Sequence, residues 1–166
     1  FQAYHAVDSM LYSVVAANRT TEALEQLLGS QNIVCHISQF IEKTPAGGYE
    51  STDSKSRGGF GSSRDVYHQD ASFNAIDAGS IVGWLAIEDA DETNGCMWCV
   101  PGSHVGGLAE CDVNHRILQQ PSATPVALAA KAGQIIFMSD LLWHSSPLNP
   151  HRRRLSLSRA RSADGP

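Results

Sequence analysis

The sequence has 166 residues, of which 42% are hydrophobic and 17% charged, and its formal net charge is −5. A chain of this length and composition can bury a substantial core, which excludes a disordered or fibrous protein. The acidic balance argues against a nucleic-acid partner, and no apolar stretch reaches the roughly 18 residues of a membrane span. We therefore expect a single domain over residues 1–166, with no nucleic-acid partner and no membrane insertion.

The first 30 residues are predicted to form a helical segment, with helix over residues 1–28. Thr21 is expected to cap a second short helix within it, and Gly29 to follow the end of that helix. Apolar residues recur there at steps of three and four, which places them on one helix face: Tyr4, Val7, Leu11, Val14 and Val15.

The pattern changes after the helical segment. Residues Ile33–Ile41 are rich in β-branched and aromatic side chains and predict a strand. The next stretch, Thr44–Ser63, is dense in Gly, Ser and charged residues and has no apolar period. A long structureless loop inside a compact domain is often a functional lid, but a disordered insertion explains the composition equally well.

The remainder of the chain is predicted to consist of short strands separated by turns. Asn94-Gly95 is a strong hairpin signal, because both residues tolerate positive φ. Many short strands without long intervening helices indicate a β-sandwich or barrel. The predicted strands are Asp65–Asp70, Ser80–Ile87, Cys96–Val100, Val126–Ala129, Gln134–Met138 and Arg153–Arg159.

The four cysteines include one C-x-x-C pair, Cys96 and Cys99. A zinc site would need a second pair or spaced histidines, and a redox site would need a turn that opens a helix. Here the pair lies in an apolar run predicted to be a strand, so we expect reduced cysteines that pack as small hydrophobic residues. This indicates a reducing, cytoplasmic compartment.

The motif His68-Gln69-Asp70 is the first candidate for metal chemistry. In an extended chain, residues two apart project to the same side, so the imidazole and the carboxylate can bind one ion. A distant histidine would complete a face of two histidines and one carboxylate, as non-haem Fe(II) oxygen chemistry requires. His144 is the best candidate, because it follows the predicted strand Gln134–Met138 and precedes the polar turn Ser145-Ser146-Pro147.

The other histidines are weaker candidates as ligands. His5 and His36 have no acidic partner at ligand spacing, and His104 ends a turn where we expect it to make a structural hydrogen bond. His115 and His151 are predicted to be solvent-exposed loop residues.

Several motifs follow one another in an order that is informative as a whole. They are His68-Gln69-Asp70, Asn94-Gly95-Cys96-Met97-Trp98, Pro101-Gly102-Ser103-His104, the run Ala132-Gly133-Gln134-Ile135-Ile136-Phe137 leading to His144, and Asn149 with the arginines before Leu155-Ser156. This series, over roughly residues 33–160, resembles the phytanoyl-CoA dioxygenase family. The resemblance implies a mainly β fold: a double-stranded β-helix (a cupin-like jelly-roll) flanked by the N-terminal helices, with Fe(II) in its mouth.

The resemblance also implies which residues bind the metal and the cosubstrate. His68, Asp70 and His144 fall on the iron ligands of the family. An arginine of the last core strand is implied to hold the distal carboxylate of 2-oxoglutarate, because a guanidinium gives a planar, two-pronged match. The family pattern before Leu155-Ser156 selects Arg152. Arg154, on the same strand face, is the alternative, whereas Arg153 is expected to point the other way. Further candidates to bind the cosubstrate are Ser146, Gln39 and Lys43.

The activity implied is that of an Fe(II)- and 2-oxoglutarate-dependent dioxygenase. Such an enzyme consumes O2, oxidises a small-molecule substrate, most commonly by hydroxylation, and releases succinate and CO2. Asp70 favours this chemistry over halogenation, because related halogenases have a small residue at the carboxylate position. Two alternatives stay open at this point: a catalytically silent jelly-roll that binds a ligand or partner, and a zinc hydrolase with the same three ligands.

Overall fold

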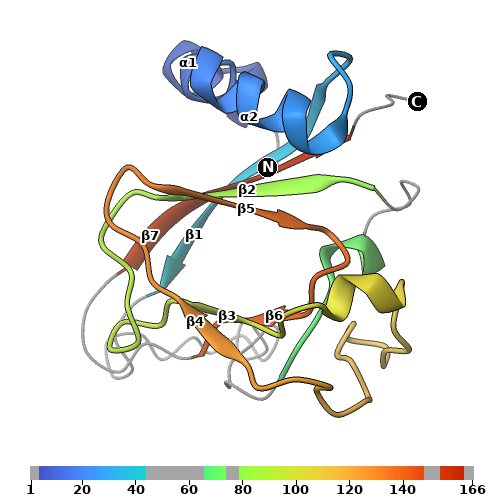
Figure 1. Cartoon of the computed structure of the whole chain (residues 1–166). Coiled ribbons are helices and arrows are strands. Elements are labelled where there is room, and N and C mark those ends of the chain that lie inside the picture. The colour runs from blue at the N-terminus through green and yellow to red at the C-terminus, as the bar shows by residue number, and fades with distance from the viewer. Residues whose placement is uncertain (1–3, 44–65, 74–78, 148–153, 163–166) are drawn as a thin grey trace.

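The computed structural model describes residues 4–43, 66–73, 79–147 and 154–162. Two antiparallel sheets face each other, and the N-terminal helices lie on the outer side of one of them (Figure 1). The four-stranded sheet has the order β1-β7-β2-β5, and the three-stranded sheet has the order β4-β3-β6. The strands are β1 (Val34–Lys43), β2 (Ile81–Ala86), β3 (Met97–Cys99), β4 (Val126–Leu128), β5 (Ile135–Ser139), β6 (His144–Ser145) and β7 (Arg154–Ser162).

The connections explain why two sheets form. The chain passes from β2 in the larger sheet to β3 in the smaller one, returns between β4 and β5, leaves again for β6, and comes back with β7. Strands that alternate between two facing sheets wind the chain as a double-stranded β-helix. The predicted mainly β, jelly-roll fold with flanking N-terminal helices is therefore confirmed. The predicted loop Thr44–Ser63 lies outside the described residues.

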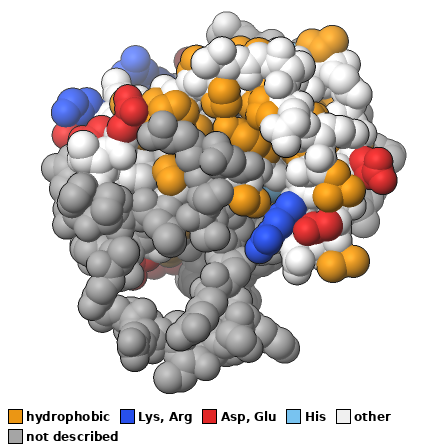
Figure 2. Space-filling model, turned by 90° about the horizontal axis from the view of Figure 1, so that it is seen from below, with side chains coloured by type: hydrophobic (Ala, Val, Ile, Leu, Met, Phe, Trp, Pro, Cys, Tyr) orange, Lys and Arg blue, Asp and Glu red, His pale blue; other side chains and the backbone are white. Residues whose placement is uncertain are grey.

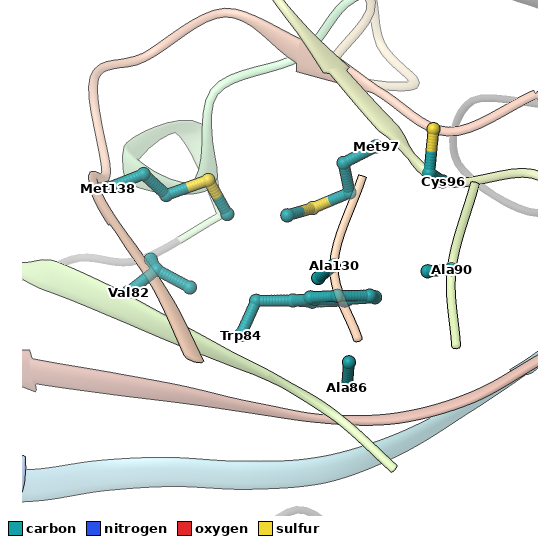
Figure 3. Close-up of a cluster of buried hydrophobic side chains, with 8 residues drawn as sticks. All are labelled: Val82, Trp84, Ala86, Ala90, Cys96, Met97, Ala130 and Met138. Carbon is teal, nitrogen blue, oxygen red and sulfur yellow. The ribbon is translucent and has the colours of Figure 1, made fainter. Parts of the chain in front are cut away.

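The larger sheet is covered on both faces, which explains the composition of its strand β2. Helices lie on one side of the sheet and the smaller sheet on the other (Figure 1). Val82, Gly83 and Trp84 are consecutive buried residues, because a strand covered on both faces cannot expose alternate side chains. Most of the core lies between the sheets (Figure 3), in a cluster of Val82, Trp84, Ala86, Ala90, Cys96, Met97, Ala130 and Met138.

The helical segment consists of a short 3-10 turn, η1 (Tyr4–Ala6), followed by α1 (Ser9–Val15) and α2 (Asn18–Leu28). Gly29 ends α2 in the left-handed conformation, with φ of 66°, as predicted.

Two predictions for this segment are wrong. Thr21 does not cap α2, which begins three residues earlier; its hydroxyl instead donates to the Asn18 carbonyl at 2.9 Å within the helix. The single predicted apolar face breaks, because Val15 is buried whereas Val7 is 71% exposed. No helix in the described parts of the chain is long and apolar enough to span a bilayer.

The Asn94-Gly95 hairpin is also a wrong prediction. The strands before and after it, β2 and β3, belong to different sheets and do not pair. Asn94 is fully buried, and its side chain bridges the Asp89 carbonyl and the Asp91 amide, both at 2.7 Å. Gly95 does adopt a positive φ of 78°. The turn is therefore real, but it carries the chain from one sheet to the other.

The predicted strand Asp65–Asp70 is reduced in the described residues to a single bridge. His68 pairs with His144, and the chain then enters the 3-10 turn η3 (Asp70–Ser72). Pairing stops there because the amide of Ala71 donates to the Asp140 carbonyl at 3.0 Å.

Candidate metal centre

Two histidines and one aspartate converge beside β6. Asp70 Oδ1 lies 3.7 Å from His68 Nε2 and 3.7 Å from His144 Nε2. One ligand atom of each residue lies within 4.8 Å of the other two. Imidazole nitrogens and a carboxylate oxygen in this number match the two-histidine, one-carboxylate set of non-haem iron sites. The three residues chosen from sequence are thus brought together.

Backbone pairing sets the relative position of the two histidines. The amide of His68 donates to the His144 carbonyl, and the amide of His144 donates to the His68 carbonyl, each at 3.0 Å. Gln69 is extended, with φ of −119° and ψ of 135°. Because side chains alternate along an extended chain, His68 and Asp70 project to the same side.

The three side chains differ in their access to solvent. Their exposed fractions are 14% for His68, 27% for Asp70 and 7% for His144. The two imidazoles are therefore largely withdrawn from water, and the carboxylate is the most accessible of the three groups.

The burial of His68 and the hydrogen bond of His144 suit metal binding. Burial, followed by the charges of His144 and His115, lowers the pKa of His68 to about 2, so this imidazole is neutral at physiological pH. His144 Nδ1 lies 2.9 Å from the Leu142 carbonyl, which can only accept. We therefore assign the proton of His144 to Nδ1, which leaves the Nε2 lone pair facing Asp70. The donor set fits a divalent metal ion.

A third imidazole, that of His115, lies near the site; the residue is in a loop, as predicted, but it is half-buried rather than solvent-exposed. Its ring is 4.1 Å from that of Phe73, which in turn contacts the His68 ring edge-on at 5.8 Å between centroids. His115 Nδ1 is buried and has no hydrogen-bond partner among the described residues. His115 is also the only non-glycine residue with positive φ in the described chain, at 60°. Its place beside the metal ligands makes it part of the candidate site.

Asp140 is a second residue that the sequence analysis missed. Its Oδ2 accepts from the Ser80 amide at 3.3 Å, and its carbonyl accepts from Ala71 at 3.0 Å. Burial raises the pKa of its carboxyl, and the negative charge of Asp70 adds to the rise. Asp140 thus ties the end of β5 both to the start of β2 and to the segment that follows Asp70.

The predicted cosubstrate residues are placed only in part. Ser146 donates its hydroxyl to the Gly95 carbonyl at 3.0 Å. Gln39 is half-buried on β1, at the edge of the larger sheet, opposite Ser158 of β7. Lys43 and Arg154 are register partners at the other end of the same strand pair. Arg152 and Arg153 lie outside the described residues.

The C-x-x-C pair does not form a disulfide. Cys96 and Cys99 are both buried outside any disulfide, and burial raises the pKa of the Cys99 thiol. The prediction that both pack in the interior is confirmed, because they are 0% and 7% exposed, and their reduced state stays a prediction. Cys99 also pairs with His144 across β3 and β6, so it supports the backbone at a candidate metal ligand.

The comparisons with known proteins agree with the geometry of the site. A family model described as Phytanoyl-CoA dioxygenase (PhyH) matches residues 2–154. The chain belongs to this family. Phytanoyl-CoA dioxygenase 1 of Oryza sativa subsp. japonica is 40% identical over 90 residues, covering 49% of this chain and 32% of the relative. Phytanoyl-CoA dioxygenase of Arabidopsis thaliana is 33% identical over 153 residues, covering 87% of this chain and 49% of the relative. The chain thus spans a third to a half of the length of these relatives.

Solved structures of a non-heme monooxygenase and of an epimerase share the fold of this family member. The non-heme monooxygenase ThoJ in its apo form has a TM-score of 0.77 and 20% identity, covering 97% of this chain and 58% of that one. The epimerase SnoN, in complex with Fe3+, alpha ketoglutarate and nogalamycin RO, has a TM-score of 0.77 and 20% identity, covering 97% and 61%. At this level of identity the likeness establishes the fold.

Proposed function

We propose that this chain is an Fe(II)- and 2-oxoglutarate-dependent dioxygenase that hydroxylates a small-molecule substrate, with consumption of O2 and release of succinate and CO2. The observation that carries the proposal is the convergence of His68, Asp70 and His144, each with a ligand atom within 4.8 Å of the others. Membership of the phytanoyl-CoA dioxygenase family supports it. Three protein ligands leave coordination positions for a cosubstrate and O2, which a closed structural zinc site would not.

Each residue of the triad has a separate part in holding iron. His68 is kept neutral by burial, so it needs to lose no proton when it binds the metal. The Leu142 carbonyl fixes the His144 ring so that Nε2 faces the metal position. Asp70 brings the negative charge that offsets part of the charge of a divalent cation. When bound, iron with 2-oxoglutarate supplies the oxidising chemistry, and the burial of both imidazoles limits access of water to it.

The cosubstrate is proposed to lie between the metal and the start of β7. In this proposal Arg152 holds its distal carboxylate, with Arg154 as the alternative, and Gln39 and Lys43 of β1 are further candidates to bind the cosubstrate. Ser146 would give its hydroxyl proton to the same carboxylate, which requires the hydroxyl to turn away from the Gly95 carbonyl. A hydroxyl rotation of this kind needs no backbone movement.

The substrate is proposed to be a small molecule without a CoA group, although many relatives carry phytanoyl-CoA in their names. A CoA thioester carries several phosphates, which basic side chains usually bind. The chain is acidic overall, with a formal net charge of −5, and the charged side chains among the described residues of the face in Figure 2 are of both signs. The buried cysteines, which form no disulfide, fit the reducing cytoplasm that we propose as its compartment.

A succinate-release screen tests the activity. Purified protein is incubated with Fe(II), 2-oxoglutarate and O2 against a library of small molecules that includes acyl-CoA thioesters and the matching free acids. We expect stoichiometric succinate and hydroxylated product with at least one free compound. Turnover with thioesters alone would overturn the substrate proposal. Binding of iron without any turnover would favour a silent binding protein, and hydrolysis that is retained with Zn2+ would favour a hydrolase.

A further inference from the structure

The residue between the two ligands of the His68–Asp70 segment is itself unusual. Gln69 is 1% exposed, among the most deeply buried polar residues in the described chain. Its extended backbone directs its side chain opposite to those of His68 and Asp70, away from the metal position. A buried amide without partners would be strongly destabilising, so its contacts decide its role.

All the hydrogen-bonding groups of this amide are used. Gln69 Nε2 donates to the Leu141 carbonyl at 2.6 Å and to the Gly107 carbonyl at 2.9 Å. Its Oε1 accepts from the Ala109 amide at 2.8 Å. Two donors directed at two carbonyls and one acceptor directed at an amide match a glutamine uniquely among side chains of this length, because glutamate lacks the donors and methionine lacks both functions.

These three bonds join the segments that build the metal centre. Leu141 lies three residues before His144, so one bond ties the first ligand segment to the chain that carries the second histidine. This bond, the His68–His144 bridge and the bond from Ala71 to Asp140 connect residues 68–71 with residues 140–144 at several points.

The bonds to Gly107 and Ala109 fix the start of a loop, residues 107–117, which we call the His115 loop. The His115 loop returns to the chain just before His68, where the Ile117 amide donates to the Tyr67 carbonyl at 2.9 Å. It carries His115 to the site between these two anchor points.

We propose that Gln69 is a positioning residue of the metal centre, whose amide holds the His68–Asp70 segment at a fixed distance from His144 and from the His115 loop. The inference rests on the metal site of the proposed function. Ligands must be held within about 0.5 Å of their binding geometry to reach full affinity. Residues that orient metal ligands without touching the metal typically change metal affinity by about 10- to 100-fold when replaced.

The experiment compares Gln69 with a second buried amide that has no metal ligand beside it. Gln69→Glu keeps the size and the acceptor, and Gln69→Met removes both functions. The matched controls are Asn94→Asp and Asn94→Leu, because Asn94 is also fully buried and bridges two backbone groups, in the turn between the sheets. The probe is Co2+, titrated anaerobically into the metal-free protein and followed by its visible absorption, with urea unfolding of each variant as a measure of stability.

We expect both Gln69 variants to bind Co2+ about 10- to 100-fold more weakly than wild type and to change the intensity of its visible bands. The Asn94 variants should lose stability in urea but keep the wild-type Co2+ affinity and spectrum. Wild-type affinity in the Gln69 variants would overturn the inference and leave the metal site intact. Equal weakening in both pairs, or Gln69 variants that do not fold at all, would show a general structural role and overturn it as well. Failure of the wild type to bind Co2+ would instead overturn the proposed metal site itself.

Discussion

His68 should make the stability of the metal-free protein depend on pH. Burial and the neighbouring His144 and His115 lower its pKa from 6.5 to about 2, so the folded protein keeps the imidazole neutral. The unfolded chain protonates the same group below pH 6.5 and then binds more protons than the folded state. The stabilising contribution is therefore complete above pH 6.5 and is lost progressively as the pH falls toward 2. His68→Gln removes this titration and keeps a polar side chain.

The size of the effect follows from the pKa difference. Below pH 6.5 each pH unit lowers the free energy of unfolding by up to about 1.4 kcal/mol for one proton. Because titration is only partial near pH 6.5, the loss between pH 6.5 and 5.5 is about 1 kcal/mol. Solvent screening reduces this loss of stability only slightly, because the His68 side chain is only 14% exposed.

Urea unfolding in the presence of a chelator, at pH 6.5, 6.0 and 5.5, measures this contribution as the difference between wild type and His68→Gln. The matched control is His36→Gln, which removes an exposed imidazole from β1 and should follow the wild-type curve. Parallel curves for wild type and His68→Gln would refute the reasoning, because they would show that His68 titrates alike in the folded and unfolded states.

Two further predictions concern the cosubstrate and the helical segment. If Arg152 holds the distal carboxylate, Arg152→Ala should raise the apparent 2-oxoglutarate KM about thirtyfold or more, and Arg153→Ala should change it little. A large effect of Arg154→Ala alone would move the assignment by two residues, and an effect of Arg153→Ala alone would contradict the assumed strand alternation. Gly29→Ala should lower the free energy of unfolding by about 1 kcal/mol, because φ of 66° disfavours alanine although no atom lies within 4 Å of the added methyl group. Gly106→Ala, equally open but at ordinary φ, is the control, and equal urea midpoints for the two variants would contradict the backbone argument.

The triad could be predicted from sequence because its geometry is mostly local. The extended conformation at Gln69 makes His68 and Asp70 neighbours on one side, and this alternation depends on backbone geometry alone. His144 is chosen because it follows the predicted strand Gln134–Met138 and precedes a polar turn, and the order of the family motifs points to the same residue. Strands β1 and β2 were likewise predictable, because their β-branched and apolar runs fit covered strands.

Apart from the Thr21 cap, which failed because α2 begins at Asn18, the failures depend on contacts between distant segments. An Asn-Gly turn looks the same in sequence whether the flanking strands pair or enter different sheets, and Asn94 is buried by the second arrangement. His115 approaches His68 only because the His115 loop is hydrogen-bonded to the chain beside His68. Asp140 meets the segment after Asp70 through a backbone bond across the two ligand segments. Neither residue stands at a spacing from the triad that suggests a shared site.

The central claim is that His68, Asp70 and His144 hold one iron ion. The most direct test is the amount of Fe2+ bound per chain in anaerobic titrations with 2-oxoglutarate present, for wild type, Asp70→Ala and the control Asp8→Ala. Asp8 caps α1, at a distance in sequence from the triad, so its replacement leaves the ligands in place. The account predicts one Fe2+ per chain in wild type and Asp8→Ala, and loss of binding in a folded Asp70→Ala protein. Iron binding that is equal in wild type and Asp70→Ala, or absent from wild type, would contradict it.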